Sequence, residues 1–194
     1  MFVERPRLQL HGVYISKTTY IRHGENSFQD QFYRPWYLID YYRYLRFFPE
    51  GVVLMWTTAE EPAASVAHLK YRQPKPGLGI MTGHYRLIGE KVVIVIKKTN
   101  QDKKQVVASN TRFRSRRKEF EQQEQTFHME LELRNVRSHR NFQLVWRRYS
   151  VCMRRDQWTQ FELSSGKYPP FAFSRVRNYT AETHAPLLTT HAYT

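Results

Sequence analysis

The chain has 194 residues, enough to bury one sizeable core, and its length favours a single domain. Aromatic residues make up 15% of the sequence, with Tyr and Phe dominant, which favours β structure over a helix-rich fold. Lysine and arginine number 31 against 17 aspartate and glutamate, and this net charge of +14 attracts acidic proteins, phosphorylated segments, nucleic acid or anionic membranes. The sequence lacks the motif signatures of nucleic-acid readers.

A single cysteine, Cys152, excludes an internal disulfide, and its apolar neighbours favour a buried structural thiol over a reactive one. The sequence has no secretory leader and no long apolar run, so we expect a reducing cytosolic or nuclear setting and no membrane contact. We expect residues 1–187 to form the domain and residues 188–194 to be a flexible tail.

Nine short segments have the composition or the period of two that predicts β-strands. They are residues 13–21, 43–48, 52–57, 85–88, 92–97, 112–117, 127–134, 144–153 and 171–176. The alternation is clearest in residues 127–134, where it predicts a core-facing side and places Glu130 and Glu132 on a solvent-facing side. The core-facing positions are Phe127, Met129, Leu131 and Leu133.

Turn residues join two pairs of these segments directly. Pro49-Glu50-Gly51 and Gly89-Glu90 each supply a glycine that can take a positive φ, which predicts two hairpins. Sequential hairpins predict an antiparallel meander, and closing it into a barrel removes the exposed edges of long strands. We therefore expect a mainly β fold, a lipocalin-like barrel with one short helix.

The helix is expected directly after residues 52–57. Thr58 and Glu61 have the spacing of a capping box, and Pro62 is tolerated in a first helical turn. Ala63, Val66 and Leu69 then form a narrow apolar stripe. The prolines and glycines of residues 71–79 end the helix and form a loop.

Arginine clusters are the strongest candidate binding residues. In an extended segment, Arg112, Arg114 and Arg116 project from one face, and guanidinium groups at that spacing suit carboxylates or phosphates. The further candidates are Arg117, Arg147, Arg148, Arg154 and Arg155. The alternative interpretation is a solvated outer barrel face, and the sequence alone does not place the clusters side by side.

A second candidate is the aromatic belt of residues 32–44, with Tyr33, Trp36 and Tyr37 as its candidate binding residues. Large rings with neighbouring arginines are common at binding hot spots because they bury area and keep a polar handle. A lid packed over one end of the barrel is the alternative.

Six ordered motifs carry a resemblance to a known family. They are GVYISKTTYIR at residues 12–22, YYRYLRFFPEG at 41–51, TTAEEP at 57–62, GHYRL at 83–87, FH at 127–128 and FAFSRVRNYTA at 171–181. Together they make residues 5–187 resemble the C-terminal domain of the F-box only protein 9 family.

The resemblance implies a substrate-recognition domain of an SCF-type E3 ubiquitin ligase, which binds substrate proteins and carries out no bond chemistry. In that family an F-box upstream of this domain holds the Skp adaptor on the cullin scaffold. F-box helices and tetratricopeptide-like helices are not found in these 194 residues, so we expect this chain by itself not to join the ligase.

Other function classes remain open from the residues alone. A basic, aromatic barrel fits single-stranded nucleic acid. A lipocalin-like barrel fits a small apolar ligand, although large inward side chains such as Phe127, Trp146 and Phe171 argue for a filled interior.

We expect no catalytic residues, metal or cofactor, because no histidine has metal-ligand spacing. Ser164-Ser165-Gly166 is interpreted as a turn.

Overall fold

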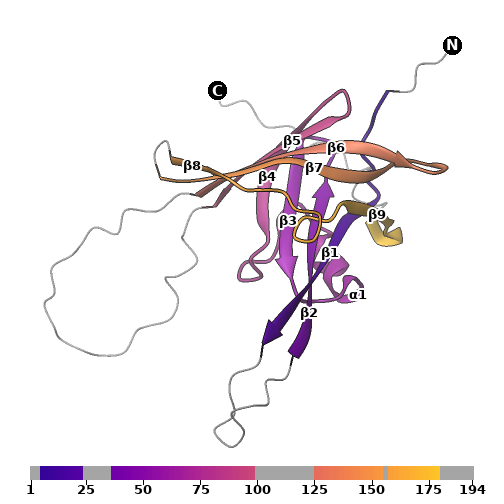
Figure 1. Ribbon diagram of the computed structural model, residues 1–194. Helices are drawn as coiled ribbons and strands as arrows, with labels where there is room; N and C mark the ends of the chain where they lie inside the picture. The colour runs from indigo at the N-terminus through magenta and orange to yellow at the C-terminus, as the bar shows by residue number, and fades with distance from the viewer. Residues whose placement is uncertain (1–4, 24–35, 99–124, 155–156, 180–194) are drawn as a thin grey trace, which may run out of the picture.

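A computed structural model describes residues 5–23, 36–98, 125–154 and 157–179 of the chain (Figure 1). These residues form strands β1 (Gly12–His23), β2 (Trp36–Phe47), β3 (Val52–Thr58), β4 (Met81–Ile88), β5 (Lys91–Lys98), β6 (Gln125–Val136), β7 (His139–Arg154), β8 (Gln157–Gln160) and β9 (Phe171–Arg175). The helices are α1 (Pro62–Ser65) and the 3₁₀ helices η1 (Val66–Leu69) and η2 (Arg177–Tyr179). No helix in these ranges is both long enough and apolar enough to span a membrane.

The strands form a closed antiparallel barrel. β1 to β7 are paired in chain order, and β9 closes the ring because it pairs with both β1 and β7. Eight strands therefore make up the barrel, and β8 pairs with β7 outside the ring. The predicted mainly β meander barrel with one short helix is confirmed.

Both predicted hairpins are confirmed. In the β2–β3 turn the Gly51 N–H donates to the Phe48 carbonyl at 3.2 Å, and Gly51 has a φ of 86°. In the β4–β5 turn Ile88 pairs with Lys91, and Gly89 has a φ of 60°. Glycine is favoured at both positions because a side chain strains this left-handed backbone.

The predicted strands mostly match, with differences at their ends. β2 begins at Trp36, seven residues before the predicted start at Arg43, and β8 has no counterpart in the prediction. The predicted strand at residues 112–117 and the predicted tail at 188–194 lie outside the described residues.

The predicted capping box is wrong. Thr58 is the last residue of β3 and pairs with Tyr42, and its hydroxyl accepts a hydrogen bond from the Glu60 N–H at 3.2 Å. The N-cap of α1 is Glu61, whose side chain makes no capping hydrogen bond. Pairing with Tyr42 keeps Thr58 in strand β3, and α1 begins only after Glu61, so Thr58 does not cap the helix. α1 continues directly into η1, where Leu69 is buried.

The barrel interior is filled by side chains. The period of two in β6 is confirmed, because Met129, Leu131 and Leu133 are buried and Phe127 packs against them. Trp146 and Phe171 are also buried in this interior cluster, with ring centroids 5.3 Å apart. The packing argues against a ligand cavity along the barrel axis.

A second buried cluster lies on the outside of the barrel beneath the helices. It contains Val13, Tyr44, Phe48, Leu54, Trp56, Leu69 and Tyr179. The hydroxyl of Tyr179 in η2 donates to the Val66 carbonyl at the start of η1, which holds the two 3₁₀ helices together. The Arg46 guanidinium is fully buried here, 3.4 Å from the ring centroid of Tyr179, so its charge faces an aromatic ring.

Candidate functional site

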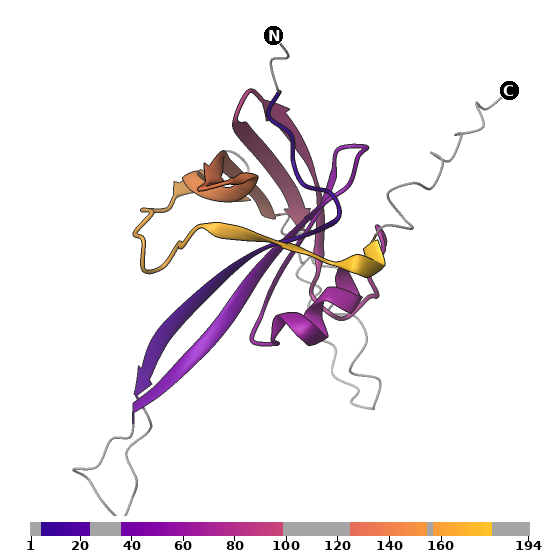
Figure 2. The same ribbon diagram turned by 90° about the vertical axis from the view of Figure 1, so that its right-hand side faces the viewer.

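Strands β1 and β2 extend beyond the barrel as a two-stranded arm. β1 pairs with β9 only over Gly12–Ile15, and β2 pairs with β3 only over Tyr42–Phe47. The pairing of β1 with β2 continues much further, to His23 opposite Trp36. Residues 16–23 and 36–41 are hereafter called the arm, which Figure 2 shows projecting away from the other strands.

Large exposed apolar side chains gather on the arm. Five of the nine such side chains in the described residues lie there, namely Leu38, Trp36, Tyr37, Ile21 and Tyr20, with exposed fractions of 74%, 68%, 54%, 52% and 46%. Apolar surface concentrated in this way is typical of a binding surface rather than of a monomer's ordinary exterior. The arm is therefore the candidate functional site.

The inner face of the arm continues the barrel interior. Tyr20, Tyr37 and Tyr41 lie on the same face as the core residues Tyr14 and Leu45, since residues two apart on a strand share a face. The rings of Tyr20 and Tyr41 lie 5.9 Å apart.

One arginine connects this inner face to the barrel. The Arg43 guanidinium lies 4.9 Å from the Tyr41 ring centroid and 5.1 Å from that of Tyr168. Tyr168 in turn lies 5.3 Å from Trp146 and 5.9 Å from Tyr149. A continuous row of rings and one guanidinium thus leads from the core onto the arm.

The outer face of the arm carries one ion pair beside apolar side chains. Lys17 Nζ lies 2.7 Å from Asp40 Oδ2, and the Thr19 hydroxyl donates to Asp40 Oδ1 at 2.5 Å. The hydrogen bonds from Lys17 and Thr19 hold the pKa of Asp40 below its ordinary value. Ile21 and Leu38 lie directly opposite each other further along the same face.

Only some of the predicted arginine sites lie within the described residues. Arg112, Arg114, Arg116, Arg117 and Arg155 lie outside the described residues, as does Tyr33 among the aromatic candidates. Arg154 is the last residue of β7. Whether the three clusters lie side by side is therefore not described, and the proposal that they form one anion site stays a prediction.

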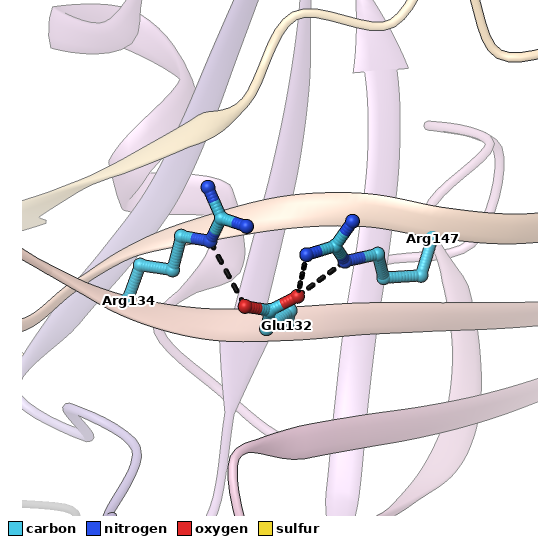
Figure 3. A network of polar contacts seen from close by, with 3 residues as sticks. All are labelled: Glu132, Arg134 and Arg147. Atoms are coloured by element: carbon cyan, nitrogen blue, oxygen red, sulfur yellow. Dashed lines mark hydrogen bonds and ion pairs between the residues drawn. The ribbon is translucent and has the colours of Figure 1, made fainter.

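Arg147 binds a carboxylate of its own chain. Its guanidinium contacts Glu132 Oε2, and Arg134 Nε lies 3.0 Å from Glu132 Oε1 on the other side (Figure 3). The hydrogen bond from Arg134 contributes most, and that from Arg147 next, to holding the pKa of Glu132 below its ordinary value. The predicted solvent-facing position of Glu132 is confirmed.

A β-bulge explains why two successive arginines both face outward. β7 pairs Arg148 with Glu130 but Trp146 with Leu131, so Arg147 is an extra residue between two ladder pairs. Both arginines are exposed while Trp146 stays buried. Glu130 is itself bound by Lys91, whose Nζ lies 3.0 Å from Glu130 Oε2.

Trp36 and Tyr37 lie on opposite faces of the arm. The alternative interpretation of the aromatic belt, as a lid over one end of the barrel, is wrong for the part of the belt that the structure describes. Residues 36–47 form a barrel strand whose first half leaves the barrel. The sequence-based prediction missed Tyr20 and Ile21 on β1, and it did not single out Leu38 within the belt. Their signal was the dense run of β-branched and aromatic residues on both sides of residues 24–35.

A polar cleft of about 710 Å³ lies between the N-terminal segment and the β4–β5 and β6–β7 turns. It is lined by Arg5, Arg7, Glu90, Asn135, Arg140 and Asn141, among others. Its lining is polar and its position is on the rim, so it does not have the form of a lipocalin-like ligand cavity.

Comparison with known proteins identifies the family. The family model described as "F-box only protein C-terminal region" matches residues 1–136. The chain belongs to this family. It is also similar to F-box protein HRT3 of Saccharomyces cerevisiae, at 39% identity over 39% of this chain and 22% of that protein. F-box protein pof7 of Schizosaccharomyces pombe is 36% identical over 32% of this chain and 17% of that protein.

The match to the F-box only protein C-terminal region covers β1 to β6, including both strands of the arm. Each match to a fungal relative covers less than a quarter of that relative's length. No solved structure matches the chain.

Glu130, Glu132 and the segment Ser164–Gly166 have structural roles in the described part of this F-box only C-terminal region. Glu130 and Glu132 are held in ion pairs, and the Ser164 carbonyl accepts the Lys167 and Tyr168 N–H groups at 3.1 and 2.9 Å, which confirms the predicted turn. Within the described ranges no three histidine, cysteine, aspartate or glutamate residues are grouped to hold a metal ion. Cys152 is partly exposed, so the predicted buried thiol is wrong.

Proposed function

We propose that this chain is the substrate-recognition domain of a receptor of the F-box only protein 9 type, acting within an SCF-type ubiquitin ligase, and that the arm binds the substrate protein. Membership of the family supports the first part. The single observation that supports the second is the gathering of five exposed apolar side chains on the arm.

The proposed role requires no bond chemistry from the domain. A receptor that holds a substrate near the ubiquitin-charged enzyme raises the effective concentration of the target lysine. The Skp adaptor and the cullin would be reached through an F-box, and substrate proteins through this domain. Cytosol and nucleus are the proposed compartments, where the single thiol would stay reduced.

Substrates with acidic or phosphorylated segments fit the net charge of +14. In this proposal Arg112, Arg114 and Arg116 attract the charged part of the substrate, and the arm anchors its apolar part. Reversing these three charges should weaken substrate capture without changing the melting temperature. If a folded triple Arg→Glu variant retains its partners at moderate salt, the arginines are a solvated face and the arm is the remaining candidate.

The experiment is affinity purification from cells with the proteasome inhibited, using the domain fused to an F-box. The test variant changes Tyr37 and Leu38 on the arm to Ser. The matched control changes Ile88 and Trp158, two other exposed apolar residues, to Ser. We expect the arm variant to lose captured proteins and the control to retain them. Equal capture by both variants would place the substrate site elsewhere, and capture of no protein by the unmodified fusion would contradict the proposed function itself.

A further inference from the structure

Among the described residues, no strand pairs with the outer edge of β2 at Leu38 and Asp40. The Phe48 N–H donates to the Val52 carbonyl at 2.9 Å, so the backbone groups of Phe48 face β3. Successive residues alternate in direction, and neither ladder of β2 has a register shift, so the N–H and C=O groups of Leu38 and Asp40 face the same side. β3 ends at Thr58 opposite Tyr42, and beyond that point no described residue pairs with this edge.

The opposite edge of the arm is partly covered. The Ser16 hydroxyl donates to the Pro169 carbonyl at 2.8 Å, and Arg43 Nη1 donates to the Lys167 carbonyl at 3.0 Å. The segment before β9 therefore runs beside the base of β1. The β2 edge has no such cover among the described residues, and it carries Leu38, the most exposed of the large apolar side chains.

Protein sheets normally protect such an edge with lysine, proline, a bulge or a covering segment. The β2 edge shows none of these over the described residues 36–41, and its charged residue, Asp40, is bound by Lys17 across the arm. An open edge with apolar residues on both faces is suited to strand addition, in which backbone hydrogen bonds give affinity and side-chain contacts give specificity.

We propose that the β2 edge of the arm binds an extended apolar segment with acidic flanks, contributed by the substrate protein, as an added β-strand. The inference rests on the proposed function, because it specifies what the arm captures.

Charge decides between this occupant and a second copy of the chain. Two copies would each carry a net charge of +14, and the arm itself has Lys17 and Arg22 against one acidic residue, Asp40. Like charges brought together oppose association, whereas acidic residues flanking an apolar segment would be attracted. A two-stranded ribbon is also only marginally stable in water, so a third strand would stabilise the arm.

The test uses the complete 194-residue chain and peptides selected on it from a random twelve-residue display library. We expect the enriched peptides to combine β-branched or aromatic residues with Asp or Glu at the ends. No enrichment, or enrichment of basic peptides, would contradict the proposal.

Three variants then separate backbone pairing from side-chain contact. Leu38→Pro removes an outward-facing N–H, a change that edge strands tolerate, while Leu38→Ala removes only the side chain. We expect the selected peptides to bind Leu38→Pro about tenfold more weakly than Leu38→Ala. Ile21 lies directly opposite Leu38, and Ile21→Pro removes an N–H that faces the β1 edge of the arm. We expect the selected peptides to bind this variant as tightly as the unmodified chain, except for any contribution of the lost Ile21 side chain.

The outcomes are distinct. Equal binding by the two Leu38 variants, with both folded by circular dichroism, would show docking through side chains only. A dimer that Leu38→Pro dissociates in sedimentation would show that a second copy occupies the edge. If the Leu38→Pro fusion with an F-box captures the same cellular proteins as the unmodified fusion, the edge proposal is wrong while the proposed function stands.

Discussion

Arg43 lies with its guanidinium 5.1 Å from the ring centroid of Tyr168, and this contact joins the arm to the barrel. The same guanidinium donates to the Thr18 hydroxyl at 3.1 Å, the Tyr41 hydroxyl at 3.0 Å and the Lys167 carbonyl at 3.0 Å. One partly buried side chain therefore fixes both strands of the arm against the segment that precedes β9.

Arg43→Met should destabilise the domain. Hydrogen bonds to a charged group contribute about 1.5 to 3 kcal/mol each when they are shielded, and the loss here should be about 1 to 3 kcal/mol because Arg43 is only partly buried. Urea denaturation measures it. Arg22→Met is the matched control, since Arg22 is exposed on the same face of the arm, and it should change stability by less than about 0.5 kcal/mol. Equal losses would mean that Arg43 has no special role in holding the arm.

Leu131→Ala should cost about 2 to 5 kcal/mol because Leu131 is fully buried in the barrel interior. Glu132→Ala, one residue later on the opposite face, removes an exposed ion-pair network and should cost less than about 1 kcal/mol. Denaturant midpoints of both variants at neutral pH check this. A larger loss at Glu132 than at Leu131 would show that the ion pairs matter more than the core contact.

The sequence predicted features that depend on local patterns. The period of two in residues 127–134 predicts the faces of β6 correctly, because successive side chains of a strand point to opposite faces. The hairpins at Gly51 and Gly89 are likewise local, since they depend on backbone conformations that glycine favours.

Features that depend on distant partners could not be predicted. The arm exists because β9 and β3 are shorter than β1 and β2, a difference that only pairing reveals. The bulge at Arg147 depends on the register between β6 and β7. Thr58 has a helix-capping pattern, but the β2–β3 ladder overrides it. In the candidate site, Trp36 and Tyr37 were predicted from composition, while their neighbours on β1 were missed.

Stability should fall on acidification partly through Glu132. Hydrogen bonds from Arg134 and Arg147 lower its pKa in the folded state, so the folded protein binds this proton less readily than the unfolded chain. The contribution is therefore present above the unfolded pKa of about 4.3 and is lost as the pH falls through the lower folded value.

Glu132→Gln should consequently be slightly less stable than the unmodified chain at pH 7, by under about 1 kcal/mol, and the difference should shrink as the pH falls below the unfolded pKa of about 4.3. Melting curves from pH 7 to pH 3 measure it, and 0.5 M salt should reduce the difference because it screens exposed pairs. A constant difference at every pH would show that the substitution acts through packing and not through charge.

Gly12→Ala should weaken the closure of the barrel. Gly12 is buried where β1 pairs with β9, and an added Cβ would collide with the Ser174 carbonyl oxygen and lie 2.7 Å from Cζ of Phe173. Backbone has little room to move in a closed ring, so the loss should reach about 1 to 3 kcal/mol or more. Gly166→Ala is the control, because a Cβ there meets nothing within 4 Å, so this substitution should be close to neutral.

Thermal melts and amide exchange in β9 measure the effect: we expect a lower melting temperature and faster exchange in β9 for Gly12→Ala alone. A Gly12→Ala variant with unchanged exchange in β9 would mean that the β1–β9 contact adapts and that this glycine is not needed to close the barrel.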